Sequence, residues 1–240
     1  MFTSCSPLGD CAVRFTFGEK LTAKTNDLVM KAIQQIKLAN LPYITEMVPG
    51  YVTLTVYYIP SFSPPFDTVI QELKNKMEHI GEGNIQELKS RQVTLPVYYG
   101  GEQGPDLNDV ASYHQINEQE LIERHVASRY RVYMIGFAPG FPYLGGLNET
   151  IATPRRKTPR KQVSAGSVGI AGPQTGVYSV NSPGGWQIIG HTPVKLFDEK
   201  KQQPTLLKTG DHVTFKSVSK KEYDEIFQAC KRGIYQPHIE

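Results

Sequence analysis

Residues 135–147 read IGFAPGFPYLGGL, and this stretch decides the interpretation of the second half of the chain. Its glycines and prolines fix unusual backbone angles, so a stiff loop presents three aromatic side chains, Phe137, Phe141 and Tyr143. Residues 130–135, just before it, are expected to form a strand. After it come short strands that glycine and proline interrupt every few residues. Such a series of strands is typical of a β-barrel or a sandwich rather than of a parallel sheet.

The segment upstream of this stretch extends the same domain. Residues 93–99 alternate as a strand, which the glycines at 100 and 101 end. Asn117 and Glu120 have the spacing of a helix capping box, which predicts a helix to about residue 128. The expected apolar face of that helix consists of Leu121, Ile122 and Val126.

The first ninety residues predict a smaller, separate α+β domain. Residues 12–17 alternate as a strand, and residues 43–48 and 51–59 predict a hairpin across the turn pair Pro49-Gly50. Two helices are expected, one from Asn26 that Pro42 ends and one after the hairpin that ends near Gly81. Their apolar faces are Leu28, Val29, Ala32, Ile33 and Ile36, and then Val69, Ile70, Leu73 and Met77. The periodicity breaks between Gly81 and Arg91, so we expect domains at residues 1–88 and 89–240.

Composition excludes several classes of protein. A hydrophobic fraction of 39% and a charged fraction of 20% fit neither a disordered chain nor a membrane bundle. No apolar run approaches the roughly 18 residues of a membrane span, and residues 1–10 lack the features of a secretory signal. The three cysteines (Cys5, Cys11 and Cys230) cannot all pair among themselves and form no CxxC. We therefore expect a soluble, cytoplasmic protein with no membrane insertion.

Charge is concentrated in one part of the chain. The net charge of +3 is too small to indicate a nucleic-acid partner. Residues 136–193, however, hold five basic side chains and a single acid, Glu149, together with 11 of the 21 glycines. Aromatic residues run through this segment, which disordered linkers lack, so an ordered, loop-rich surface is expected. The basic residues are Arg155, Arg156, Lys157, Arg160 and Lys161.

The sequence contains none of the following common catalytic motifs. There is no GxxxxGK[ST] phosphate loop. Ser167, in AGSVG, lacks the glycine two places earlier that a nucleophile elbow needs. The six histidines and three cysteines show no metal-ligand spacing, so no metal is expected and each histidine is expected to be structural or exposed. Sequence spacing alone supplies no complete active site.

Binding is therefore the more informative prediction. The aromatic loop either forms a binding groove or closes the end of a barrel as core, and both interpretations stay open. The basic stretch 154–161 can hold an anionic substrate or an acidic partner, although a solvated charged loop is the more common outcome. His191 can act as an acid or base near neutral pH, or be structural. Candidate substrate- or partner-binding residues are Phe137, Pro139, Phe141, Tyr143, Arg155, Arg160, Ser167, Gln174, Trp186 and His191.

Long motifs in this segment resemble one family closely. They are IGFAPGFPYLGGL, PRRKTPRKQVSAGSVGIAGPQTG at 154–176 and SPGGWQIIGHTP at 182–193, followed by Gly210-Asp211. The series resembles the family of 5-oxoprolinase B subunits, also called KipI-like or allophanate-hydrolase-subunit-1-like proteins, over nearly the whole chain. Two positions depart from it, because the family often has arginine where His191 stands and proline where Ser164 stands.

This resemblance implies a fold and an activity. The fold is α+β, a small α/β N-terminal domain followed by a cyclophilin-like β-barrel domain. The activity is that of the B subunit of an ATP-dependent 5-oxoprolinase, which converts 5-oxo-L-proline to L-glutamate together with its A and C subunits. The complex uses ATP, no cofactor is assigned to this chain, and no activity of the chain alone is expected. The alternative is an inhibitor that binds a sensor histidine kinase and blocks its autophosphorylation; a peptidyl-prolyl isomerase is a weaker option.

Overall fold

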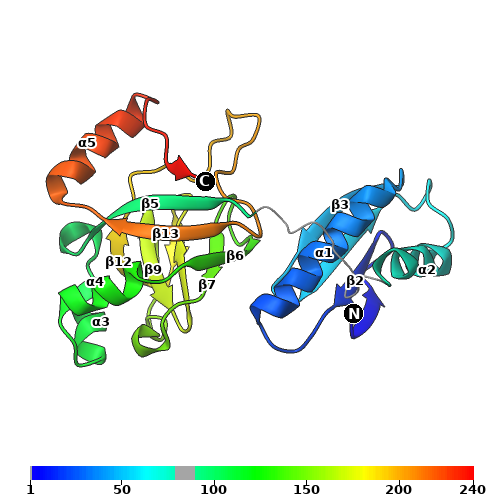
Figure 1. Cartoon of the computed structure of the whole chain (residues 1–240), viewed down its shortest axis with the longest axis horizontal. Coiled ribbons are helices and arrows are strands. Elements are labelled where there is room, and N and C mark those ends of the chain that lie inside the picture. Colours follow the sequence, from blue (N-terminus) through cyan, green and yellow to red (C-terminus); the bar gives the residue numbers. More distant parts are fainter. Residues whose placement is uncertain (1, 79–89) are drawn as a thin grey trace. The chain divides into compact units, whose positions relative to one another are not determined.

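The computed structural model describes residues 2–78 and 90–240. The chain divides into two compact units, Met1–Lys89 and Ser90–Glu240 (Figure 1). The expected domain boundary after residue 88 and the expected helix end at Gly81 lie outside the described residues. No helix within residues 2–78 and 90–240 is long and apolar enough to cross a membrane.

The N-terminal unit is a four-stranded antiparallel sheet with two helices on one face. The strand order is β1-β2-β4-β3, and the predicted hairpin is confirmed because β3 pairs with β4. Alternate residues of the central strands point to the same side and are buried against both helices. The elements are β1 (Ser4–Pro7), β2 (Ala12–Thr16), α1 (Ala23–Ala39), β3 (Ile44–Pro49), β4 (Thr53–Tyr58) and α2 (Phe66–Met77).

Helix α1 differs from its prediction at both ends. It begins three residues earlier than Asn26, because the side chain of Thr22 accepts a hydrogen bond from the backbone N–H of Thr25 and caps the helix. It ends at Asn40, which adopts the left-handed conformation with φ 46°, so Pro42 is not what ends it. The predicted apolar face is correct, since its buried members lie in the core of this unit.

The C-terminal unit is a closed barrel. Seven of its strands follow the order β12-β9-β10-β7-β6-β13-β5, and pairing of β5 with β12 closes the ring. Among the described pairs of these seven strands, β5–β13 alone is parallel. The predicted fold class, α+β with a β-barrel as the second domain, is confirmed. The barrel strands are β5 (Gln92–Tyr99), β6 (Tyr130–Ile135), β7 (Pro142–Gly145), β9 (Ser167–Ala171), β10 (Gln174–Val177), β12 (Gln187–His191) and β13 (His212–Ser217).

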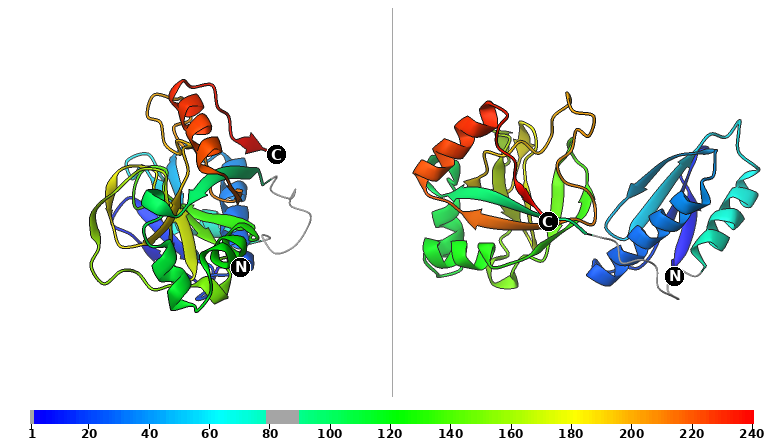
Figure 2. Two further views of the ribbon diagram at one scale, coloured as in Figure 1. Left: turned by 90° about the vertical axis from the view of Figure 1, so that its left-hand side faces the viewer. Right: turned by 45° about the horizontal axis from the view of Figure 1, so that its top comes forward.

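The remaining elements of this unit lie around the barrel. β8 (Arg160–Val163) and β11 (Ser182–Gly184) form a separate two-stranded sheet, and β14 (His238–Ile239) extends the barrel beside β5. Sequence patterns missed α3 (Leu107–Tyr113) and α5 (Lys220–Lys231), and Figure 2 shows α5 on the outside of the barrel. Two short 3₁₀ helices, η1 (Gly101–Gln103) and η2 (Glu149–Ile151), complete the unit.

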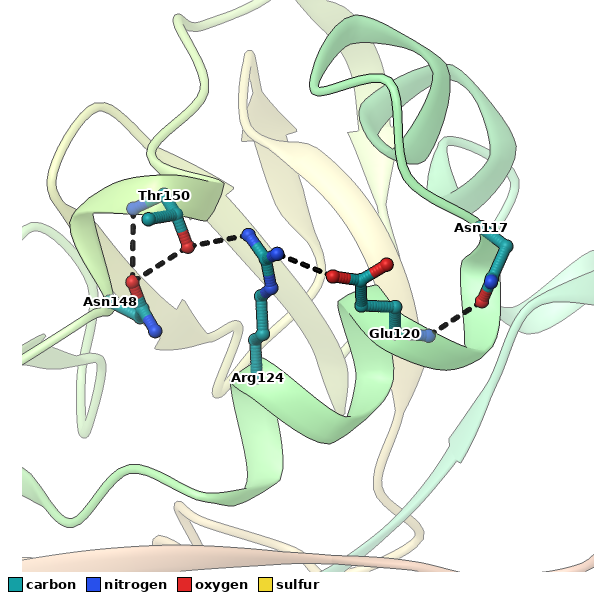
Figure 3. A network of polar contacts seen from close by, with 5 residues as sticks. All are labelled: Asn117, Glu120, Arg124, Asn148 and Thr150. Atoms are coloured by element: carbon teal, nitrogen blue, oxygen red, sulfur yellow. Dashed lines mark hydrogen bonds and ion pairs between the residues drawn. The ribbon is translucent and has the colours of Figure 1, made fainter.

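Helix α4 (Glu118–Val126) is capped and anchored by the polar contacts in Figure 3. The side chain of Asn117 accepts a hydrogen bond of 2.8 Å from the backbone N–H of Glu120, as the capping prediction requires. The Glu120 carboxylate, however, pairs with Arg124 instead of returning to the cap. Arg124 also donates to the hydroxyl of Thr150 at 2.7 Å, and Thr150 donates to Asn148. This chain of contacts joins α4 to η2.

A fully buried histidine lies inside the barrel. The hydroxyl of Tyr99 is 2.8 Å from Nδ1 of His125, and Nε2 of His125 is 3.0 Å from the hydroxyl of Thr175. Thr175 donates its own proton to the carbonyl of Gly169, so it accepts from Nε2–H, and Nδ1 accepts from Tyr99. Burial lowers the pKa of His125 to about 3. The ring is therefore neutral and structural, as expected for a histidine without ligand spacing.

Candidate functional site

The aromatic loop folds around the ring of Phe141. This ring is 2% exposed and stands edge-on to Tyr143 at 5.0 Å, to Tyr178 and Trp186 at 5.4 Å, and to Phe137 at 5.6 Å. The members come from the loop after β6, from β7, and from the segments after β10 and before β12. Edge-to-face contacts at these distances are favourable. The cluster is thus core at its centre, which is one of the two interpretations that the sequence left open.

A cavity of about 230 Å³ opens onto the same cluster, so the groove interpretation also holds. Phe137 lies at the edge of this cavity and is 66% exposed. Its backbone adopts the left-handed conformation, with φ 68°, which costs a non-glycine residue about 1–2 kcal/mol. We call this cavity the aromatic pocket. It is lined by Phe137, Phe141, Tyr143, Arg155, Pro159, Tyr178, Pro183, Gly184, Gly185 and Trp186.

Two glycines allow the rings to approach the backbone closely. A Cβ atom on Gly184 would lie 2.1 Å from the hydroxyl of Tyr178, and one on Gly176 would lie 2.8 Å from the Trp186 ring. No larger residue fits at either position without displacing an aromatic ring. At these two positions, the glycine therefore serves close packing of the rings.

Arg155 supplies positive charge at the rim of the aromatic pocket. Its guanidinium carbon lies 5.9 Å from the centre of the Trp186 ring, within the range of a cation–π contact. Among the described residues, Arg155 has no carboxylate partner. The two ion pairs nearby in the sequence are made by Arg156 and Arg160. Burial raises the pKa of Tyr143, so its hydroxyl remains a neutral donor. The rim can therefore attract an anionic group.

The basic stretch 154–161, which we call the strap, is ordered by a carboxylate that the sequence analysis missed. Asp106 is 2% exposed, and its Oδ1 accepts hydrogen bonds of 2.7 Å from both Arg156 and Arg160. Arg160 is thus engaged in an ion pair and does not line the aromatic pocket. Most residues of the strap are exposed, as the solvated-loop interpretation expects, but Arg156 and Arg160 are half-buried and held by Asp106.

Four further candidates lie outside the aromatic pocket. The carbonyl of Pro139 accepts a hydrogen bond of 2.6 Å from Ser179, which holds the aromatic loop. Ser167 is buried in β9, and Gln174 lies in β10 opposite Ala171. Neither contributes to the lining.

His191, the fourth, connects the barrel to its last helix. Its Nε2 donates to the carbonyl of Ala165 at 2.8 Å, and its Nδ1 accepts from the hydroxyl of Tyr223 in α5 at 2.9 Å. Burial lowers its pKa. Both ring nitrogens are used, so the geometry favours the structural role over the acid–base role.

The structure brings together five of the ten candidates: Phe137, Phe141, Tyr143, Arg155 and Trp186. Tyr178, Pro159 and Pro183 were missed, although Pro159 and Pro183 lie within the quoted motifs and Tyr178 follows the first of these two motifs by two residues. The described residues of the lining include no carboxylate, imidazole or thiol. Among residues 2–78 and 90–240, no three His, Cys, Asp or Glu side chains gather as a metal site would require. The lining of the aromatic pocket therefore suits a ligand with a flat apolar part and a negative group.

Comparison with known proteins defines the class to which this barrel and pocket belong. A family model described as carboxyltransferase domain, subdomain C and D, matches residues 3–207, and the chain belongs to this family. The 5-oxoprolinase B subunit of Bacillus subtilis is 44% identical over 225 residues, which are 90% of this chain and 93% of that protein. The 5-oxoprolinase B subunit of Haemophilus influenzae is 49% identical over 172 residues, covering 72% and 78%. The predicted membership of the family of 5-oxoprolinase B subunits is thus confirmed.

A solved structure supports the fold. The crystal structure of the urea amidolyase of K. lactis superposes with a TM-score of 0.80 over 98% of this chain. This chain spans 16% of that protein, and the two are 20% identical. The likeness therefore concerns the α+β architecture with its barrel.

Proposed function

We propose that this chain is the B subunit of an ATP-dependent 5-oxoprolinase in the cytoplasm, converting 5-oxo-L-proline to L-glutamate together with the A and C subunits. The names of the similar proteins support this assignment, since both are 5-oxoprolinase B subunits and are covered over most of their length.

The observation that carries the proposal is the aromatic pocket with Arg155 at its rim. 5-Oxoproline is a small flat lactam ring with one carboxylate. Its ring fits the aromatic lining of the pocket, in which Phe137 is the exposed ring, and its carboxylate fits the guanidinium of Arg155. The cavity, at about 230 Å³, is large enough for a single-ring ligand.

The same pocket explains why partner proteins are needed. A lactam is a stable amide, and coupling to ATP makes its carbonyl open to attack by water. That attack requires a general base and groups that hold phosphate, and the lining of the aromatic pocket offers no carboxylate or imidazole for the first role. We assign binding and orientation of 5-oxoproline to this chain, and activation and hydrolysis to the complete complex.

The test is reconstitution from the purified proteins. Glutamate release from 5-oxoproline and ATP is expected when this chain is combined with the A and C subunits, and not from this chain alone or from those two without it. Robust release by the single chain would overturn the shared-site model. No release from a correctly assembled complex would overturn the activity itself.

The exposed ring of Phe137 favours a second candidate, inhibition of a sensor histidine kinase. An exposed aromatic side chain beside a pocket, such as Phe137 at 66% exposure, is typical of a protein-binding surface. Phe137→Ala is expected to weaken kinase binding by about 2 kcal/mol. Unchanged inhibition of kinase autophosphorylation by this variant would exclude the pocket from that role.

A further inference from the structure

Asp106 lies where three parts of the barrel unit meet. It is the residue before α3, and its Oδ1 accepts from Nη1 of Arg156 and Nη2 of Arg160 at 2.7 Å each. Its Oδ2 accepts from the backbone N–H of Ile188 at 2.6 Å, and its own N–H donates to the Ile188 carbonyl at 2.9 Å. A single buried residue therefore joins α3, β12 and the strap.

The strap that Asp106 holds is one wall of the aromatic pocket. Arg155 and Pro159 line the pocket, while Arg156 and Lys157 line a second cavity of about 420 Å³ next to it. The backbone N–H of Arg156 donates to the carbonyl of Gly185 at 2.7 Å, beside Trp186. Arg155 therefore belongs to a segment that a main-chain bond and two ion pairs fix on the barrel.

The Asp106 carboxylate lies between the positive charges of Arg156 and Arg160. The two guanidinium nitrogens that share Oδ1 are each 2.7 Å from it, so they are no more than about 5.4 Å apart. Arg156 and Arg160 would repel each other without the carboxylate between them. Both side chains are partly shielded from water, at 35% and 26% exposure, so solvent screens this repulsion only in part. Without Asp106 the strap would also lose both ion pairs that tie it to α3 and β12, and it would keep main-chain contacts such as the bond from Arg156 to Gly185.

We infer that Asp106 is the positioning residue of the aromatic pocket: it holds the strap against the barrel and thereby keeps Arg155 over Trp186. It does not touch a ligand in the pocket and acts through Arg156 and Arg160. The consequence is a pocket that prefers anionic ligands, and for 5-oxoproline this consequence rests on the proposed function.

The test uses the single tryptophan of the chain, Trp186, which is 5% exposed and lies in the pocket. Asp106→Asn in the full-length protein is expected to shift tryptophan emission to longer wavelength and to increase quenching by acrylamide. In the reconstituted complex, it is expected to raise the KM for 5-oxoproline about tenfold, through loss of charge-assisted bonds. Glu118→Gln is the control, because it removes a negative charge from an exposed position of α4 that lines neither cavity beside the strap; it should leave Trp186 emission unchanged.

A second variant covers the case in which Asp106→Asn does not fold, since removing one partner of a buried ion pair can unfold a protein. The double variant Arg156→Gln and Arg160→Gln removes the two ion pairs by changing the strap instead of Asp106. Like Asp106→Asn, it should shift Trp186 emission to longer wavelength and increase its quenching by acrylamide. A variant that circular dichroism shows to be folded, with wild-type emission and quenching, would overturn the inference even if its melting temperature fell. Changed Trp186 signals with an unchanged KM would support the positioning role and count against 5-oxoproline as the ligand of the pocket.

Discussion

The stability of the barrel unit should depend on pH through His125. This ring is fully buried, neutral and bonded through both nitrogens, and burial lowers its pKa from 6.5 to about 3. In the unfolded chain the same group takes up a proton near pH 6.5. Between these two values, the unfolded state binds more protons than the folded state, so stability is lost as the pH falls below 6.5. At pH 5, this group alone should lower the free energy of unfolding by about 2 kcal/mol relative to pH 7.5.

The assay is urea denaturation followed by tryptophan fluorescence at pH 7.5, 6 and 5. Because Trp186 is the only tryptophan, the signal reports on the barrel unit alone. His125→Gln cannot titrate, so its stability should be lower at pH 7.5 but should fall by about 2 kcal/mol less than wild type on going to pH 5. His238→Gln, at an exposed position in β14, is the control and should follow the wild-type curve. Equal losses in wild type and His125→Gln would refute the reasoning.

Three further changes test the pocket. Gly184→Ala should destabilise the barrel unit by about 1–3 kcal/mol in thermal melts, because its Cβ would meet the hydroxyl of Tyr178. Gly185→Ala is the control and should change the stability little, because its Cβ would lie 3.5 Å from the nearest atom. Equal melting temperatures of the two variants would refute this packing argument. Arg155→Gln should raise the KM for 5-oxoproline in the complete complex about tenfold with little change in kcat, and an unchanged KM would remove Arg155 from substrate binding. Phe137→Ala should change the free energy of unfolding by less than about 1 kcal/mol, since its ring is exposed; a larger loss would show that this ring is core.

Packing also changes which aromatic residues are suitable for tests of binding. Sequence analysis places Phe137, Phe141 and Trp186 in one group with one expected role. In the structure, Phe141 and Trp186 are 2% and 5% exposed, so alanine at either position removes part of a hydrophobic cluster. Substitution at Phe137 separates binding from stability, because only this ring lies mainly in solvent.

Local patterns located β2 to β6, α1, α2 and α4, and predicted the later strands only as a series without bounds. Alternation located β2, β5 and β6 to within about one residue, and the Pro49-Gly50 turn predicted the hairpin of β3 and β4. These signals succeed because the period of a strand and the chemistry of a turn depend on neighbours in the sequence. Helix α3 is only seven residues long and carries no side-chain cap bond, so it left little trace in the sequence.

The sequence by itself predicted a barrel or a sandwich, the family from long motifs, and four of the five aromatic side chains of the pocket, because periodicity, turn residues and motifs are local properties. Only the tertiary structure decided which basic side chains are available to a ligand. Asp106 lies 50 and 54 positions from the two arginines it binds, and no pattern of spacing relates a lone aspartate to partners so distant in the sequence. Closure of the barrel brings them together, and the resulting ion pairs withdraw Arg156 and Arg160 while leaving Arg155 over Trp186.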